Sequence, residues 1–192
     1  MKLRSIALAA LAAVSFGAQA TLTTYAPWDT AYSANGLAGV LFNVQSANGV
    51  TVALGAHGYK NGASLANDGV NTYYANSGIY PGEPTKNYAN WSFDFAYDLG
   101  NCQTCDVLLS INGQEGKVTG FGPNSWNMEM GFLGLNFDPF SPSSTAFGLR
   151  IVDGKDELVG SDITVNVPEP GSLALLGLGL AGLAAARRRK VA

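Results

Sequence analysis

Apolar and polar side chains alternate through much of the middle of the chain. From Trp91 to Tyr97, aromatic residues occupy every second position, and small or acidic residues fill the positions between them. Successive side chains of a β-strand point to opposite faces, so a period of two predicts strands with one buried face and one face in solvent. This alternation, with short runs rich in β-branched residues, predicts about eight strands, near residues 39–45, 50–56, 91–97, 107–111, 116–121, 126–132, 147–151 and 163–167.

Turn sequences containing glycine separate these segments. Asn48-Gly49 and Asp153-Gly154 are two of several Asn-Gly and Asp-Gly pairs, which are typical of short hairpin turns. Between the two ends of the chain no segment keeps a helical period of 3.6, and residues 60–90 have a weak period that predicts a long loop or irregular strands. We therefore predict an all-β fold, an antiparallel β-sandwich or jelly-roll-like ectodomain.

The beginning of the chain has the three parts of a secretory signal peptide. Lys2 and Arg4 precede an uncharged run at residues 6–14, and Ala18 and Ala20 form a small-x-small cleavage sequence. A permanent N-terminal anchor is the weaker alternative because the apolar run is short. We expect the export machinery to translocate the chain and signal peptidase to cut after Ala20.

The other end combines a proline motif, an apolar stretch and a basic cluster. In Pro168-Glu169-Pro170, the prolines favour extended backbone and remove N–H donors, which predicts an exposed peptide. Residues 172–186 carry no charge and are rich in Leu and Ala, which predicts one transmembrane helix with Ser172 as its N-cap. Four cations then form a membrane stop that stays cytoplasmic: Arg187, Arg188, Arg189 and Lys190.

The predicted helix is short for a permanent span. Residues 173–186 would extend about 21 Å at ~1.5 Å per residue, whereas a bilayer core is roughly 30 Å thick. Snorkelling arginines add reach, and the lack of a polar face argues against the alternative of a buried C-terminal helix. We therefore divide the chain into a signal peptide (1–20), an ectodomain (21–167) and a sorting region (168–192) that the membrane holds transiently.

Charge is distributed unevenly along the chain. All 14 acidic residues lie between Asp29 and Glu169 together with five basic residues, so this part has a net charge of −9, although the whole chain has −3. Such an acidic domain does not attract nucleic acid or anionic lipid through its net field. Nucleic acid is therefore not an expected partner.

The C-terminal arrangement resembles the PEP-CTERM sorting signal of exported bacterial proteins. In that family a membrane-embedded, cysteine-protease-like exosortase is thought to recognise Pro-Glu-Pro and cut near it. The resemblance implies that Pro168, Glu169 and Pro170 are substrate residues of an exosortase. It also implies a Gram-negative bacterium that makes exopolysaccharide and biofilm, brief anchoring in the inner membrane, and a final place at the cell surface or in the extracellular matrix.

Cys102 and Cys105 are the two cysteines of the chain. In an exported protein such a pair favours a disulfide, here one that closes a tight turn between two predicted strands. A redox Cys-x-x-Cys site is the alternative, but it needs a helix N-terminus after the motif, where this chain has a predicted strand. A zinc site needs four ligands, more than two cysteines and one histidine supply.

We predict no catalytic residues and no bound metal or cofactor. His57, the sole histidine, is expected in a loop after a strand, and neither Gly-x-Ser-x-Gly nor His-Glu-x-x-His is present. Asp94 and Asp98 share the outward face of one predicted strand, where paired carboxylates would suit glycoside cleavage or calcium. Solvated faces and turn chemistry are the favoured interpretation, also for the acidic residues around a second turn: Asp153, Asp156 and Glu157.

Aromatic residues are frequent in loop-like segments: Tyr25, Trp28, Tyr32, Tyr59, Tyr73, Tyr74, Tyr80 and Tyr88. Such rings either stack on sugars or anchor loops on the core, and we favour anchoring. The sequence thus predicts an exported, non-catalytic surface or matrix protein associated with exopolysaccharide. The alternatives are a polysaccharide-binding module, with or without calcium, and a secreted glycoside hydrolase.

Overall fold

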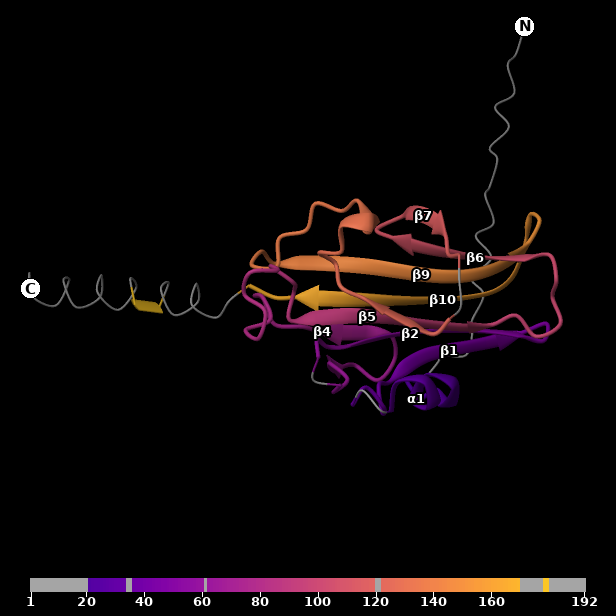
Figure 1. Cartoon of the computed structure of the whole chain (residues 1–192), viewed down its shortest axis with the longest axis horizontal. Coiled ribbons are helices and arrows are strands. Elements are labelled where there is room, and N and C mark those ends of the chain that lie inside the picture. The colour runs from indigo at the N-terminus through magenta and orange to yellow at the C-terminus, as the bar shows by residue number, and fades with distance from the viewer. Residues whose placement is uncertain (1–20, 34–35, 61, 120–121, 170–177, 180–192) are drawn as a thin grey trace, which may run out of the picture.

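The computed structural model describes residues 21–33, 36–60, 62–119, 122–169 and 178–179. Two β-sheets make up most of this part of the chain and pack face to face (Figure 1). The prediction of an all-β domain is therefore confirmed. The expected signal peptide, and all but two residues of the helix expected at 172–186, lie outside the described residues. Within those residues no helix is long and apolar enough to cross a membrane.

The smaller sheet has four antiparallel strands in the order β1-β2-β5-β8. They are β1 (Phe42–Ala47), β2 (Val50–Gly58), β5 (Trp91–Asp98) and β8 (Asn124–Trp126). Asn48 and Gly49 join β1 to β2 with left-handed φ angles of 53° and 77°, as a two-residue hairpin turn of type I′ requires. The predicted Asn-Gly turn therefore lies where the sequence placed it.

The larger sheet has six strands in the order β3-β4-β10-β9-β6-β7. They are β3 (Ala66–Asn67), β4 (Thr72–Tyr74), β6 (Cys105–Ile111), β7 (Gln114–Lys117), β9 (Ser143–Asp153) and β10 (Asp156–Val167). β9 and β10 form a long antiparallel hairpin that turns at the predicted Asp-Gly pair. β4 pairs with β10 in parallel, which departs from the fully antiparallel arrangement expected from the sequence.

The main hydrophobic core lies between the two sheets. Leu54 of β2 and Phe95 of β5 point into it and are at most 1 % exposed. The ring of Phe93 stacks on that of Phe147 from the opposite sheet, with ring centroids 4.5 Å apart. Burial of each such side chain stabilises the fold by roughly 1.5–3 kcal/mol relative to exposure. The apolar positions of the alternating segments thus form the core between the sheets.

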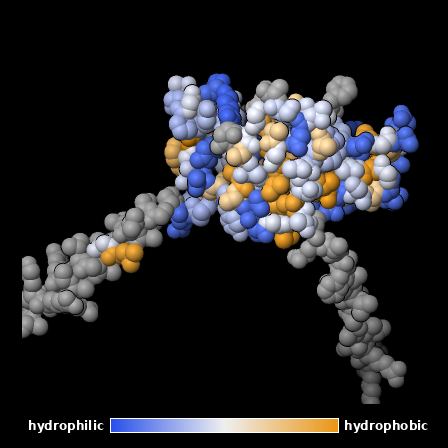
Figure 2. Space-filling view, turned by 90° about the horizontal axis from the view of Figure 1, so that it is seen from below, coloured by the Kyte–Doolittle hydropathy of each residue, from blue (hydrophilic) through white to orange (hydrophobic). Residues whose placement is uncertain are grey.

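A short helix covers the outer face of the four-stranded sheet. This helix, α1 (Ala26–Tyr32), lies beside β1 in Figure 1 and buries Trp28 in a second apolar cluster with Val40, Phe42, Ala53 and Ala96. Seven residues are too few to show a helical period, so the sequence did not predict α1. Viewed from the side of α1, the surface mixes apolar patches with hydrophilic residues (Figure 2).

Two predicted segments have a different or an irregular structure. Residues 126–132 alternate like a strand, but β8 ends at Trp126 and a 3₁₀-helix follows at Gly131–Leu133. The prediction of a strand there is therefore wrong. The segment 60–90 contains the short strands β3 and β4 among turns and bends, as the weak period predicted.

Candidate functional site

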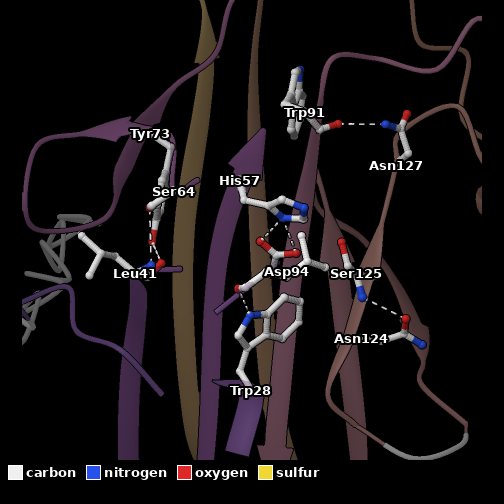
Figure 3. Close-up of polar contacts among 11 residues, drawn as sticks. Trp28, Leu41, His57, Ser64, Tyr73, Trp91, Asp94, Asn124, Ser125 and Asn127 are labelled. Atoms are coloured by element: carbon white, nitrogen blue, oxygen red, sulfur yellow. Dashed lines mark hydrogen bonds and ion pairs between the residues drawn. The ribbon is translucent and has the colours of Figure 1, made fainter. Parts of the chain in front are cut away.

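The sole histidine of the chain forms a buried pair with Asp94 (Figure 3). His57 Nδ1 lies 2.7 Å from Oδ2 and 2.9 Å from Oδ1 of Asp94. Gly55 of β2 is opposite Asp94 of β5, so His57 is a diagonal neighbour of Asp94 on the outer face of the sheet. His57 is 2 % exposed and Asp94 0 %. The expectations of a loop histidine and a solvated Asp94 are wrong because β2 extends to Gly58 and α1 covers this face.

Side chains of α1 form the lid over this pair. Trp28 is fully buried, its Nε1 donates to the Leu37 carbonyl oxygen at 2.9 Å, and its ring centroid lies 6.4 Å from that of His57. Tyr32 stacks on Trp28 and donates its hydroxyl hydrogen to the Pro123 carbonyl oxygen at 3.1 Å. Since Pro123 just precedes β8, these bonds hold α1 across the sheet and exclude water from the pair.

Burial acts on the carboxyl group of this pair. Removal from water raises the pKa of the Asp94 carboxyl, and the adjacent His57 and the Ser125 side chain oppose this rise. Both carboxyl oxygens of Asp94 engage Nδ1 of His57. The carboxyl group therefore fixes the orientation of the imidazole ring and leaves Nε2 on the side away from Asp94.

A cavity of about 260 Å³ opens beside the pair and is lined by Leu37, His57, Tyr59, Lys60 and Ser125. The Nε2 atom of His57 has no hydrogen-bond partner in the described part of the chain. A ring that is almost fully buried, and fixed by a carboxylate, therefore has its second nitrogen available to a molecule in this cavity.

Lys60, which lines the cavity, shares one glutamate with a second lysine, Lys86. Lys60 forms an ion pair with Glu83, and Lys86 Nζ lies 3.3 Å from the second carboxylate oxygen. These contacts lower the pKa of Glu83, mainly through its hydrogen bond with Lys60. The group thus carries one more positive than negative charge.

The order of the polar groups differs from that of a serine hydrolase. In a Ser-His-Asp relay the hydroxyl contacts the imidazole, and the imidazole contacts the carboxylate. Here Asp94 is the middle group, because both His57 and the Ser125 side chain hydrogen-bond to its carboxyl. Ser125 is therefore not placed as a nucleophile that His57 activates.

At the C-terminal end of the domain the chain changes from buried strand to exposed peptide. Val167 is the last residue of β10, is 3 % exposed and pairs with Ser143 of β9. Pro168 and Glu169 follow at once, and both are exposed. The prediction that β10 ends at Val167, without a linker before the proline motif, is confirmed as far as Glu169.

A family model described as the PEP-CTERM protein-sorting motif matches residues 166–190. The chain carries a PEP-CTERM sorting motif. The match begins within β10 and includes Pro168, Glu169 and Pro170, so the resemblance inferred from the sequence is confirmed. The motif indicates an exported protein that is sorted to the cell envelope and implies recognition by an exosortase. Comparisons with curated proteins and with solved structures give no match.

Several predicted site residues lie outside the part of the chain that the structure describes. They belong to the signal cleavage site, to the end of the proline motif and to the membrane stop: Ala18, Ala20, Pro170, Arg187, Arg188, Arg189 and Lys190.

The predicted disulfide is present. Cys102 and Cys105 are bonded, with Cα atoms 5.7 Å apart. The Cys102 N–H donates to the Leu99 carbonyl oxygen at 2.9 Å, so the disulfide closes a hydrogen-bonded turn between β5 and β6.

The carboxylates that the sequence placed on one face do not share a site. Asp98 is exposed four residues beyond Asp94, about 13 Å along a strand, whereas glycoside hydrolases hold two carboxyl groups roughly 5–9.5 Å apart. Near the other turn, Glu157 pairs with Arg150 at 3.0 Å. Within the described residues no group of three His, Cys, Asp or Glu side chains is arranged to bind a metal ion.

Some of the loop aromatics anchor their loops. Trp28 and Tyr73 are fully buried, and the Tyr73 hydroxyl donates to the Leu41 carbonyl oxygen at 2.7 Å. Tyr59 is half-buried at the cavity and makes edge-on contacts, with ring centroids 5.3 and 5.6 Å apart, to Tyr80 and Tyr88. The anchoring interpretation therefore holds for the first two residues, and Tyr59 lies at the candidate site.

Sequence reasoning missed Lys60 and Ser125 as residues of the site. One signal was available, because the outer face of β2 and β5 carries Ala53, Gly55 and Ala96. Small residues leave room for a covering element, whereas a solvated face usually carries larger polar side chains. That pattern indicates a covered face, but it does not identify what covers it.

Proposed function

We propose that the chain is an exported, non-catalytic surface or matrix protein that an exosortase releases from the inner membrane of a Gram-negative bacterium. The observation that carries this proposal is the exposure of Pro168 and Glu169 directly after the last paired residue, Val167. Proline-rich extended peptide is a form that a protease can bind without unfolding the domain.

In this proposal the helix predicted at 172–186 holds the chain in the membrane while the domain folds outside it. Because no linker separates β10 from the motif, cleavage takes place with the folded domain close to the membrane. The order of His57, Asp94 and Ser125 supports a non-catalytic role, since it lacks a hydroxyl bound to the imidazole.

Intact-mass analysis of the exported protein tests this function. We expect the protein from cells with an active exosortase to have lost Arg187 to Lys190, and the protein from exosortase-deficient cells to retain them. Glu169→Gln should block the loss. Asp156→Asn, which changes an exposed carboxylate at the β9–β10 turn, should be processed normally. Retention of the four basic residues in the presence of the exosortase would overturn the proposal.

Association with exopolysaccharide is the second part of the proposal. The specific observation that favours it is the cavity beside His57, with Tyr59 and Lys60 at its walls. Aromatic and polar groups around a hollow suit a sugar, which has apolar faces and polar edges. Co-sedimentation of the exported protein with isolated matrix polysaccharide checks this part, and a protein that stays in the supernatant contradicts it.

A further inference from the structure

Hydrogen-bond donors converge on the cavity beside His57. Both oxygens of Asp94 hold Nδ1 of its ring, so Nε2 is the ring nitrogen that a molecule in the cavity can reach. Lys60, whose ammonium is a donor, lines the same cavity. An ammonium has no acceptor, and an imidazolium whose Nδ1–H is bound by a carboxylate presents Nε2–H as a donor. The occupant that satisfies these groups is therefore rich in acceptor oxygens.

Charge favours an anionic occupant at this place. The part of the chain between Asp29 and Glu169 has a net charge of −9 and five basic residues, two of which are Lys60 and Lys86. Both share Glu83, so one positive charge of the group is uncompensated. A ligand carboxylate would bind Lys60 while Lys86 continues to neutralise Glu83. Charge-assisted hydrogen bonds of this kind are about twice as strong as neutral ones.

The size and the apolar walls of the cavity limit the occupant further. Its volume of about 260 Å³ is just below the roughly 300–1,000 Å³ of sites for drug-sized ligands, which suits one monosaccharide ring rather than an extended oligosaccharide. Leu37 and the ring of Tyr59 provide apolar surface on which the C–H face of a sugar can pack. Donors for a carboxylate and walls for a saturated ring thus meet in one cavity.

We propose that this cavity binds one uronic acid residue, whose carboxylate accepts hydrogen bonds from the Lys60 ammonium and from Nε2 of a His57 imidazolium that Asp94 holds in place. This inference rests on the proposed association with exopolysaccharide and specifies its ligand class as an acidic sugar. Asp94 is a positioning residue in this site, because it orients the imidazole from behind and is itself fully buried.

Histidine-selective NMR tests the inference directly, because the chain has a single histidine. The exported, untagged protein labelled with ¹⁵N-histidine is titrated with galacturonate and glucuronate, and both ring nitrogens are observed. We expect the Nε2 resonance to shift saturably while Nδ1, held by Asp94, changes little. Galactose and glucose, which lack the carboxylate, should produce at most a small shift. Acetate, which lacks the ring, should bind at least tenfold more weakly than the uronates.

Two lysine variants, one inside the cavity lining and one outside it, give a matched comparison that does not disturb the buried pair. Lys60→Gln should weaken uronate binding about tenfold, since it removes a charge-assisted hydrogen bond. Lys86→Gln removes the same charge from the far side of Glu83 and should change binding less than threefold. Both lysines are about half exposed, so both variants should fold.

Three results would overturn the inference: no shift of Nε2 at saturating uronate, equal affinity for acetate, or equal effects of the two lysine variants. These results are separable from failure of the proposed sorting function. Cleavage near Pro168 is measured by mass and does not involve the cavity, and sedimentation with polysaccharide can persist without uronate binding at His57.

Discussion

The side chain of Asn127 and the backbone of Ala89 hydrogen-bond to each other in both directions. Asn127 Nδ2 donates to the Ala89 carbonyl oxygen at 2.8 Å, and the Ala89 N–H donates to Oδ1 at 3.1 Å. Nδ2 also donates to the Trp91 carbonyl oxygen at 2.9 Å. Asn127 is fully buried. Its side-chain amide forms the hydrogen bonds with the backbone of Ala89 and Trp91 that a neighbouring strand would otherwise form.

Asn127→Ala should lower the free energy of unfolding by about 2–4 kcal/mol. The substitution removes four hydrogen bonds, one of them from the Glu129 N–H. It leaves buried backbone groups of Ala89 and Trp91 without partners, and each unsatisfied buried group costs roughly 1–3 kcal/mol. Urea unfolding of the exported protein measures the change. Asn136→Ala, an exposed asparagine nine residues later, is the control and should change stability by less than about 0.5 kcal/mol. Equal effects of the two substitutions would contradict the role of Asn127.

The same amide explains where the sequence pattern failed. Residues 126–132 alternate as a strand does, but Asn127 takes the partners that would have continued the sheet, and the chain turns into Gly131–Leu133. Alternation predicts which face of a segment is buried, and at Phe93 and Phe147 that prediction succeeded because neighbouring strands pair there. Alternation does not show whether the hydrogen bonds of a segment are made by a neighbouring strand or by a side chain.

The candidate site shows a second limit of sequence reasoning. The period of two placed Asp94 on a face that was expected to be in solvent, and His57 was expected in a loop, so neither residue was assigned a buried role. What buries them is α1, whose Trp28 and Tyr32 are held by carbonyl oxygens of distant loop residues. These bonds depend on tertiary structure and leave no local period. The proline motif and the disulfide were predictable because both depend on residues that are adjacent in the sequence.

The His57–Asp94 pair should behave as one unit in a double-mutant cycle. His57→Leu or Asp94→Leu alone leaves a buried polar partner, which typically costs about 3–5 kcal/mol. The double variant removes both groups and adds apolar volume, so its loss should be smaller than the sum of the single losses by at least about 2 kcal/mol. Urea unfolding of the four proteins measures the coupling. Additive losses would show that the two groups do not interact.

Asp68 should make stability depend on pH in the acidic range. Its carboxylate accepts the N–H of Thr72 at 3.0 Å, and also those of Val70 and Asn71, and these bonds lower its pKa from 3.8 to about 2. The folded state therefore binds this proton less tightly than the unfolded state. The contribution of the Asp68 carboxylate to the free energy of unfolding is complete above about pH 4, and it is lost as the pH falls from 4 towards 2.

The expected contribution of Asp68 is about 1 kcal/mol. The full difference in pKa would correspond to roughly 2.4 kcal/mol, and exposure of the carboxylate to solvent reduces it. Asp68→Asn should therefore reduce the loss of stability between pH 5 and pH 2 by about this amount, measured by urea unfolding at each pH. Asp156→Asn, also exposed, should leave the loss unchanged. A variant Asp68→Asn with the pH dependence of the unmodified protein would contradict the assignment.

Gly100 should tolerate a side chain much less well than Gly113, although both have left-handed backbone. Their φ angles are +52° and +80°, and alanine in this conformation costs roughly 1–2 kcal/mol. A Cβ on Gly100 would lie 2.2 Å from the Gly49 carbonyl oxygen, whereas one on Gly113 meets nothing within 4 Å.

Gly113→Ala therefore has only the conformational cost of a left-handed alanine. Gly100→Ala has the same cost and, in addition, a clash with the backbone of Gly49. Relief of the clash requires the turn after β5 to move away from the β1–β2 turn, which contains Gly49. We expect Gly113→Ala to lower the free energy of unfolding by about 1 kcal/mol and Gly100→Ala by at least about 2 kcal/mol more. Thermal and urea unfolding of both variants measure the difference. Equal losses for the two variants would mean that the turn after β5 does not contact the β1–β2 turn in solution.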